Sequence, residues 1–377
     1  MKIGIVTLHK VINYGSALQA YALQHYLETT FNAEVEIVDY KYPNAYHKVK
    51  VPLKETVTFW ISRIIEYVFR HRGRELKLFK RFYDKYFTLS DTYYTSIEQV
   101  NKKAPLYDIY MTGSDQVWNV DTLRNDPVMY CAFAPKGKKK VSFSASFTLN
   151  EIPHEYENTI ANYLSSYSYI GVREMSSMQI LKKLNLDDSI IQECTCDPTL
   201  LLSAEDYDRV AEDSIINVQE DYVLAYFLCY AYNPEPAFSN VLDNLHRLYG
   251  CKVIVIGRNS FSYNGEYQKI NGLGPSEFVY LFKNAKAVVT SSFHGTMFSI
   301  IYRKPLYAIV PAKGGKDSRI SDVLNTIGIS ASIVHSDEET IHDLPVNPYT
   351  DVVLSKLDDY ITKSKDFIAN ALSNVKS

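Results

Sequence analysis

Residues 2–40 read KIGIVTLHKVINYGSALQAYALQHYLETTFNAEVEIVDY, and this stretch decides the fold class. The apolar run KIGIVTLH is typical of a strand buried in a parallel sheet. A turn over residues 9–13 follows it, then the helical pattern SALQAYALQHYLETTF, which we expect to be amphipathic, and then the strand VEIVDY. Strand, helix and strand in this order predict a parallel βαβ unit that opens an α/β domain.

The same alternation continues along the chain in two cycles, separated by an acidic, loop-like stretch over residues 199–220. We therefore predict an α/β protein with two Rossmann-like domains, at residues 1–205 and 220–345, and a cleft between them. A C-terminal helix within residues 350–377 is expected to pack back across their junction. Further strands are predicted at residues 107–114, 141–147, 169–174, 222–228, 252–257, 287–292 and 305–310, and further helices at residues 54–70, 75–86, 155–163, 176–184, 237–249, 276–284 and 295–304.

The composition is that of an ordinary globular protein. With 377 residues, of which 46% are hydrophobic and 22% charged, the chain is long enough for two cores and is neither disordered nor collagen-like. The net charge of -3, without a long run of one sign, argues against a general nucleic-acid binder. Basic stretches at residues 71–74 and 136–140 are typical of a solvated face, with contact to an anionic membrane surface as the alternative.

The sequence also suggests a compartment. The opening MKIGIVTLHK lacks the pattern of a signal peptide, and no segment reaches the roughly 18 apolar residues of a spanning helix. The five cysteines are an odd number without a disulfide pattern, and Cys194 and Cys196 lack the spacing of a zinc site. We expect a cytoplasmic protein with no metal and no cofactor, which contacts the inner face of the membrane only peripherally.

Polar residues follow several predicted strands, at the edge where open α/β sheets bind ligands. Asn13, Tyr14, Gly15 and Ser16 come after the first strand. Asn13 or Ser16 can cap the next helix, Gly15 allows close approach to its backbone, and the free N–H groups of the first turn suit a phosphate or a carboxylate. An ordinary capped turn is the alternative.

Two more polar motifs follow strands in the first half of the chain. In TGSDQVWN, Asp115 is a candidate general base or ligand of an acceptor hydroxyl, Gln116 adjoins it, and Trp118 can stack on a sugar ring. A turn with Trp118 in the core is the alternative. In GVRE, Arg173 can hold an anion through two hydrogen bonds, and an ion pair with Glu174 or a neighbour is the alternative.

The stretch TSSFHGTMFSIIYRKP places His294 between a strand and the first turn of a helix. A helix N-terminus disfavours the cationic imidazole unless a bound anion reverses the field, so a phosphorylated substrate would make His294 a proton donor. A histidine bonded to backbone is the alternative. Farther on, Lys313, Lys316 and Arg319 flank a glycine pair, which indicates an anion-binding loop or a solvated surface loop.

Taken together, five motifs resemble those of the polysaccharide pyruvyl transferase family: NYGSALQAYAL, TGSDQVWN, GVRE, DPTLLL and SSFHGTMFSIIYRKP, in this order. The resemblance extends from residue 1 to about residue 328. It implies a fold similar to the two-domain GT-B glycosyltransferases and a transfer of the enolpyruvyl unit of phosphoenolpyruvate to a sugar of a surface-polysaccharide (exopolysaccharide) precursor. A pyruvate ketal forms and phosphate leaves. A GT-B nucleotide-sugar glycosyltransferase is the first alternative, and a non-catalytic sugar-binding or scaffold protein is the second.

The resemblance also implies roles for matching residues. His294 would be the general acid or a donor ligand, and Asp115 would lie near an acceptor that is a sugar or a lipid-linked oligosaccharide. The first domain would take the acceptor and the second the donor. The expected donor-binding residues are Arg173, Ser292, Phe293, Gly295, Thr296, Lys313, Lys316 and Arg319, and the expected acceptor-binding residues are Asn13, Tyr14, Gly15, Ser16, Gln116 and Trp118.

One position departs from the family pattern. Several members of the family carry a basic residue two positions before the histidine, where this chain has Ser292. A cation that would bind the donor is therefore missing at that position. We expect Lys313, Lys316 or Arg319 to compensate.

Overall fold

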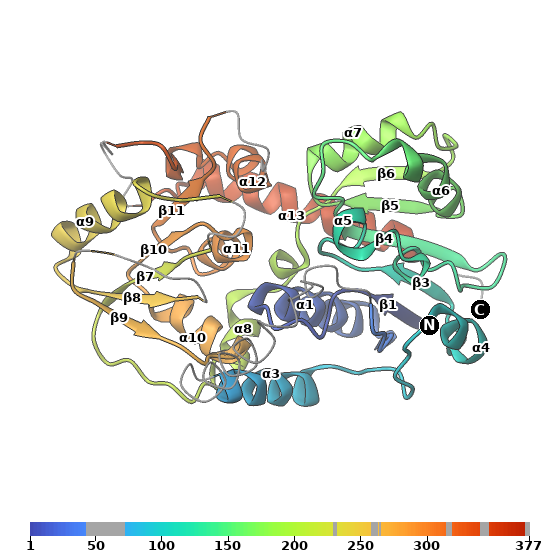
Figure 1. The fold of residues 1–377 in the computed structure, drawn as a ribbon, viewed down its shortest axis with the longest axis horizontal. Helices are drawn as coiled ribbons and strands as arrows, with labels where there is room; N and C mark the ends of the chain where they lie inside the picture. Colours follow the sequence, from blue (N-terminus) through green and yellow to red (C-terminus); the bar gives the residue numbers. More distant parts are fainter. Residues whose placement is uncertain are drawn as a thin grey trace, which may run out of the picture. The chain divides into compact units, whose positions relative to one another are not determined.

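The computed structural model describes residues 1–42, 72–228, 232–257, 263, 265–313, 319–339 and 347–373. The described residues include two six-stranded sheets, one in each of two compact units (Figure 1). The two Rossmann-like domains expected from the sequence are present, whereas the helix predicted at residues 54–70 lies outside the described residues. Unit 1 falls within Met1–Val51, Tyr83–Leu201 and Tyr360–Ser377, and unit 2 within Pro52–Phe82 and Leu202–Asp359.

The sheet of unit 1 is parallel throughout, with the strand order β2-β1-β3-β4-β5-β6. Ile3 of β1 pairs with Val35 of β2 on one side and with Ile109 of β3 on the other. The chain thus moves outward from β1 to β2 and returns on the other side of β1, which creates a topological switch point between β1 and β3. The strands are β1 (Lys2–Val6), β2 (Glu34–Ile37), β3 (Ile109–Thr112), β4 (Lys139–Ala145), β5 (Tyr169–Val172) and β6 (Ile191–Cys194).

Helix α1 (Tyr14–Phe31) follows β1 and begins at a capped turn, because the Asn13 side chain accepts a hydrogen bond of 3.2 Å from the Ser16 N–H. Residues 15–24 are buried without interruption, so this part of α1 is enclosed on all sides and the prediction of an amphipathic helix is wrong there. The other helices of unit 1 are α4 (Ile97–Lys103), α5 (Val120–Leu123), α6 (His154–Leu164), α7 (Met175–Lys183) and the short 3-10 helices η3 (Pro127–Tyr130) and η4 (Pro198–Leu201).

The sheet of unit 2 is also parallel and has the order β12-β11-β10-β7-β8-β9. This is the Rossmann order, with its switch point between β7 and β10. The runs YVLAY, AVVT and LYAIV are fully buried, which explains why they could be recognised as core strands. The strands are β7 (Tyr222–Tyr226), β8 (Lys252–Ile256), β9 (Tyr267–Ile270), β10 (Ala287–Thr290), β11 (Leu306–Val310) and β12 (Ile333–His335).

The acidic stretch at residues 199–220 contains a helix, α8 (Ala204–Ala211), so its prediction as loop-like is wrong. Ser203 and Asp206 form a capping box, in which each side chain accepts a hydrogen bond from the backbone of the other. Acidic residues at this end favour a helix start, because they complement its partial positive charge. The other helices of unit 2 are α9 (Ala237–Tyr249), α10 (Pro275–Asn284), α11 (Phe293–Ile301), α12 (Arg319–Ile327) and the 3-10 helix η5 (Ser330–Ser332).

Two helices contribute residues to both units. The division falls between Phe82 and Tyr83 in α3 (Arg72–Tyr86), and between Asp359 and Tyr360 in α13 (Asp351–Leu372). Within unit 1, α13 packs Phe367 against Phe143, with ring centroids 6.4 Å apart. None of the helices in the described ranges combines the length and the apolar character needed to cross a membrane.

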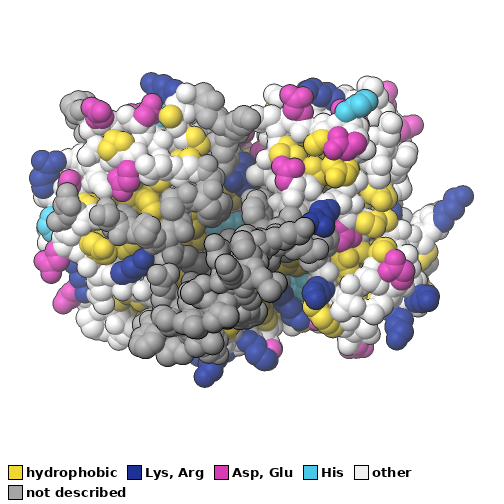
Figure 2. All heavy atoms as spheres, in the orientation of Figure 1, with side chains coloured by type: hydrophobic (Ala, Val, Ile, Leu, Met, Phe, Trp, Pro, Cys, Tyr) yellow, Lys and Arg dark blue, Asp and Glu magenta, His cyan; other side chains and the backbone are white. Residues whose placement is uncertain are grey.

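Acidic and basic side chains are interspersed on the face shown in Figure 2. In the basic stretch at residues 136–140, the prediction of a solvated face fails for Lys140, which is buried on β4. Its Nζ donates a hydrogen bond of 3.0 Å to Ser166 Oγ, and burial lowers its pKa. Lys138 lies 4.0 Å from a carboxylate oxygen of Asp108, which already offsets its charge in part.

Candidate functional site

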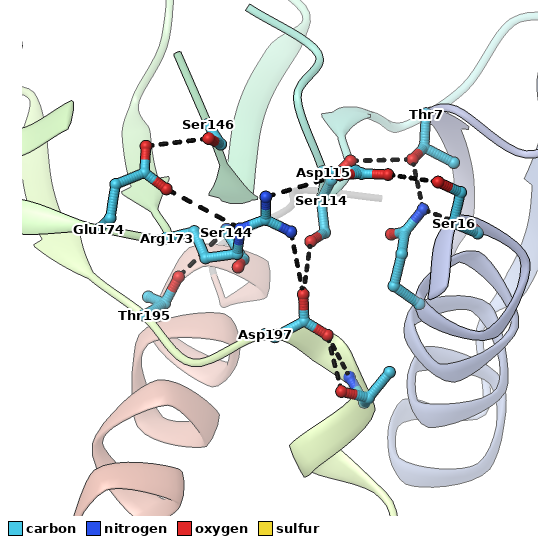
Figure 3. Close-up of polar contacts among 12 residues, drawn as sticks. Thr7, Ser16, Ser114, Asp115, Ser144, Ser146, Arg173, Glu174, Thr195 and Asp197 are labelled. Atoms are coloured by element: carbon cyan, nitrogen blue, oxygen red, sulfur yellow. Dashed lines mark hydrogen bonds and ion pairs between the residues drawn. The ribbon is translucent and has the colours of Figure 1, made fainter. Parts of the chain in front are cut away.

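Asp115 lies at the switch point of unit 1, just after β3. Its Oδ2 accepts a hydrogen bond of 2.6 Å from Ser16 Oγ in the first turn of α1 (Figure 3). The backbone of Asp115 has a φ of 78°, a conformation that L-residues rarely adopt, and its carbonyl accepts hydrogen bonds from Val117 and Ser146 that hold it there. The structure thus brings together two of the residues singled out in the sequence, at the edge of the sheet where ligands bind.

Arg173 follows β5 and is 2% exposed. Its guanidinium lies among three carboxylates (Figure 3). Nη1 is 3.2 Å from Asp197, Nη2 is 3.5 Å from Asp115, and Nε is 3.8 Å from Glu174. The positive charge of Arg173 is therefore already offset within unit 1. The geometry supports the ion-pair alternative and counts against Arg173 as a binding residue for an anionic donor.

Asp197 is the most firmly held of the three carboxylates. Its Oδ1 accepts hydrogen bonds from the backbone N–H of Thr199 at 3.0 Å and from the Thr199 hydroxyl at 2.7 Å. Its Oδ2 accepts from Arg173 at 3.2 Å and from Ser114 Oγ at 3.4 Å. Four donors occupy a group that has about four acceptor positions, so Asp197 is a fixed counterion.

Glu174 is held as well, through hydrogen bonds from the hydroxyls of Ser146, at 2.9 Å, and Ser177. Asp115 is held more loosely by the described residues, because its Oδ1 has only the 3.5 Å contact to Arg173 and its Oδ2 the bond from Ser16. The side chain of Asp115 is also 8% exposed, against 1% for Glu174. Of the three acids, Asp115 is therefore the least enclosed by hydrogen bonds.

Trp118 does not lie at the surface of this site. It is 1% exposed, donates a hydrogen bond of 3.2 Å to the Met129 carbonyl, and stacks on Tyr130 with ring centroids 5.7 Å apart. A sugar cannot stack on a ring that is enclosed in the core, so the structure contradicts the proposed stacking role and favours the core alternative. Gln116, beside Asp115, is partly exposed.

Tyr42 interacts with Asp115, and neither Tyr42 nor its neighbour Tyr93 was indicated by the sequence motifs. Burial, together with the charges of Asp115 and of Tyr93, raises the pKa of Tyr42 well above its usual value. Tyr93 is 52% exposed, and the Lys10 ammonium lies 5.5 Å from its ring centroid. An abundance of tyrosine does not by itself distinguish such positions from the many buried ones.

A second ionic cluster lies beyond β1 and β2, at residues to which the sequence had given no role. The ring nitrogens of His9 lie 3.1 Å from the Thr7 carbonyl and 3.2 Å from Asp39 Oδ1. Both partners are hydrogen-bond acceptors. Burial alone would raise the pKa of Asp39, but its bonds with His9 and with Lys10, at 2.6 Å, outweigh burial and lower that pKa.

His294 lies at the switch point of unit 2, just after β10. Helix α11 begins at Phe293, so His294 is the second residue of the helix. The sequence had suggested that His294 comes before the helix, and this prediction is wrong. Ser292 caps this helix, because its Oγ accepts a hydrogen bond of 3.3 Å from the Gly295 N–H. The residue that replaces the expected cation thus has a local structural role.

The turn around His294 is lined by hydroxyl groups. Thr290 Oγ1 accepts from the Ser292 N–H at 3.1 Å, and the Thr296 hydroxyl donates to the Ser292 carbonyl at 3.1 Å. A Cβ on Gly295 would clash with Thr290 Oγ1, so only glycine fits at this position without displacement. His294 is 9% exposed. The N-terminal N–H groups of α11 and these hydroxyls make the turn rich in hydrogen-bonding groups.

The expected donor cations differ in their positions. Arg319, at the start of α12, has its guanidinium carbon 6.0 Å from the ring centroid of Phe293, the neighbour of His294. Lys313 is exposed, and Lys316 lies outside the described residues. Arg319 is thus the candidate that the structure brings to the His294 turn. Over the described part of the chain, no group of three or more His, Cys, Asp or Glu side chains is arranged to hold a metal ion.

The sequence matches the family model of polysaccharide pyruvyl transferases over residues 13–312. No curated protein matches it. Similar solved structures include the UDP-GlcNAc 2-epimerase of Methanocaldococcus jannaschii in complex with UDP-GlcNAc and UDP, with a TM-score of 0.50, 13% identity and 99% of each chain covered. A UDP-N-acetylglucosamine 2-epimerase has a TM-score of 0.53 and 11% identity, with 98% of this chain and 95% of that chain covered. At these identities the likeness shows a GT-B-like fold alone.

Proposed function

Because the chain belongs to the polysaccharide pyruvyl transferase family, we propose that it transfers the pyruvyl group of phosphoenolpyruvate to a sugar of an exopolysaccharide precursor. The product would be a pyruvate ketal across two hydroxyls, with release of phosphate. The observation that supports this function best is that the two switch points differ in chemistry. Unit 1 has a loosely held carboxylate there, Asp115, and unit 2 has a histidine at a helix N-terminus, His294.

A site for the donor must supply positive charge to bind it and a proton to activate it. Phosphoenolpyruvate carries a phosphate and a carboxylate, which suit the N-terminus of α11 and the guanidinium of Arg319. A proton from His294 to the methylene carbon would turn it into a methyl group and leave the adjacent carbon electrophilic. We assign this general acid role to His294 and donor binding to Phe293, Gly295 and Thr296 as well.

The acceptor must lose the protons of its two hydroxyls as they bond to the electrophilic carbon. We assign the first proton to Asp115, whose Oδ1 has spare acceptor capacity, and the second leaves with the phosphate. Ser16 orients the Asp115 carboxylate through the 2.6 Å bond. Asn13, Tyr14, Gly15 and Gln116 stay in the proposed acceptor site, from which Trp118 is removed.

Phosphate release tests the function directly. The protein is incubated with phosphoenolpyruvate and with galactose- or mannose-bearing acceptors, both free and lipid-linked. We expect acceptor-dependent phosphate release and an acceptor whose mass has increased by one pyruvate ketal. Phosphoenolpyruvate without acceptor is the control for simple hydrolysis. A folded protein that releases no phosphate with any acceptor of a broad panel would contradict the proposal.

A nucleotide-sugar glycosyltransferase is the second candidate. The Rossmann strand order of unit 2 and the helix N-terminus at its switch point would also suit a nucleotide diphosphate. Thermal melts separate the two functions, because UDP or GDP, and not phosphoenolpyruvate, would then raise the melting temperature. We place the reaction in the cytoplasm, at the inner face of the membrane when the acceptor is lipid-linked.

A further inference from the structure

We propose that Asp197 is a positioning residue, which keeps Asp115 basic by holding the Arg173 guanidinium. This inference rests on the proposed function, in which Asp115 takes a proton from the acceptor. Asp197 belongs to the DPTLLL motif that follows β6, a strand that the sequence did not reveal. It is 1% exposed and therefore acts through its neighbours and not on the substrate itself.

The geometry divides the three acids into two kinds. Arg173 Nη1 makes a hydrogen bond of 3.2 Å with Asp197, whereas its Nη2 lies 3.5 Å from Asp115, outside hydrogen-bonding geometry. A cation that is bound closely by one carboxylate stabilises the ionised form of a second one less. Thr199 fixes Asp197 from the other side through two hydrogen bonds, so Asp197 in turn fixes the position of the guanidinium.

Charge balance within the cluster supports the same division. Among the described residues, the carboxylates of Asp115, Glu174 and Asp197 share the guanidinium of Arg173. Of these acids Asp115 has the weakest hydrogen bonding, so its basicity depends most on how closely the guanidinium approaches it. Of the described titratable groups, Tyr42 interacts with Asp115, Cys196 and Tyr360 interact with Asp197, and the charge of Lys365 acts on Cys196.

Asp197→Asn tests the inference. The amide oxygen can still accept both bonds from Thr199, but the amide nitrogen would face the guanidinium as donor against donor. We expect Arg173 to turn toward Asp115 and make it a weaker base. The acidic limb of the kcat/KM profile should then move to lower pH by about one unit, and the plateau should fall about three- to tenfold.

The matched control is Asp187→Asn. Asp187 is exposed and its Oδ1 accepts a hydrogen bond of 2.8 Å from the Ser189 N–H, in the same two-residue turn that Asp197 makes with Thr199. This variant should leave the pH profile unchanged. A purely structural role of Asp197 would lower the plateau without moving the acidic limb, and that result would overturn the inference.

Two further measurements keep the inference testable. If Asp197→Asn does not fold, Glu174→Gln removes the weaker competitor for Arg173, and the limb should move in the same direction by a smaller amount. If the wild-type protein has no pyruvyl transfer activity, the titration of Asp115 is followed by NMR with carboxyl-labelled aspartate, assigned by means of Asp115→Asn. A titration midpoint that stays the same in Asp197→Asn would contradict the inference, independently of the proposed function.

Discussion

The two switch points share a backbone plan and differ in charge. In each unit a buried parallel strand ends, a short turn follows, and a helix begins with a side-chain cap, Asn13 in unit 1 and Ser292 in unit 2. The edge of unit 1 gathers one guanidinium and three carboxylates. The turn of unit 2 is lined by the hydroxyls of Thr290, Ser292 and Thr296 around His294.

This difference shows how one fold can prepare two kinds of chemistry. A carboxylate cluster repels an anionic donor but can take protons from a neutral sugar hydroxyl. A helix N-terminus with neutral side chains attracts an anion and repels none. The strand order brings each motif to a switch point, but the charges in the turn decide what it can bind.

Removing the buried cation should have the largest effect. Arg173→Met leaves Asp115, Glu174 and Asp197 without their counterion, and we expect the free energy of unfolding to fall by about 3–5 kcal/mol at pH 7. The deficit should shrink as the pH is lowered, because protonation removes the repulsion among the three acids. Chemical denaturation of both proteins from pH 7 to pH 4 measures this change.

Arg81→Met is the control for this prediction. Arg81 is half-exposed and lies 3.7 Å from Asp213, so its loss should cost less than about 1 kcal/mol and show little pH dependence. An equal loss in the two variants, or a deficit in Arg173→Met that is constant over the pH range, would show that the carboxylates of unit 1 are not stabilised by Arg173.

Removing the imidazole should affect turnover and leave stability nearly unchanged. His294→Ala is expected to lower kcat by at least about 100-fold, the low end for loss of a positioned proton donor. His246→Ala is the control, since His246 lies on α9, and its Nδ1 is 3.1 Å from the Cys251 carbonyl at an exposed position. A loss of tenfold or less in His294→Ala would leave His294 with a structural role only.

Most of the fold could be predicted from the sequence, and the reason lies in the central strands. Runs such as YVLAY and AVVT are buried on both faces and therefore stand out as continuous apolar segments. Strands β6, β9 and β12 escaped prediction because they lie at the sheet edges and are partly exposed. The burial of these three strands is incomplete, so no apolar run marks them.

The candidate site could be predicted only in part. The motifs identified Asp115, Ser16 and His294 at the strand ends, because polar residues after an apolar run are unusual. The contact of Arg173 with Glu174 was among the alternatives, but its nearest acid could not be predicted, since Asp197 is 24 positions away and follows an edge strand that was missed. His9 was also overlooked, because its partner Asp39 is 30 positions away. Pairings of this kind are created by sheet order and not by local spacing.

The cap of α11 offers a smaller test. Ser292→Ala removes the acceptor for the Gly295 N–H and should lower the free energy of unfolding by about 0.5–2 kcal/mol. Ser203→Ala removes the matching cap of α8 and should cost a similar amount. Only the change at Ser292 should also raise the KM for phosphoenolpyruvate. Equal KM values in the two variants would remove the α11 N-terminus from the proposed donor site.

The smallest expected effect concerns the second ionic cluster of unit 1. The pKa of Asp39 is lowered by its bonds with His9 and Lys10, so its carboxylate stabilises the fold above the unfolded-state value of about 3.9. That contribution is lost as the pH falls through the lower, folded-state pKa. Asp39→Asn should therefore be less stable than the wild type by about 1 kcal/mol at pH 7, and the gap should narrow below pH 4. The loss of unfolding free energy in Ser292→Ala should stay constant over the same pH range, because this change removes no charge. If the loss in Asp39→Asn were equally independent of pH, ionisation would not distinguish the two sheet edges.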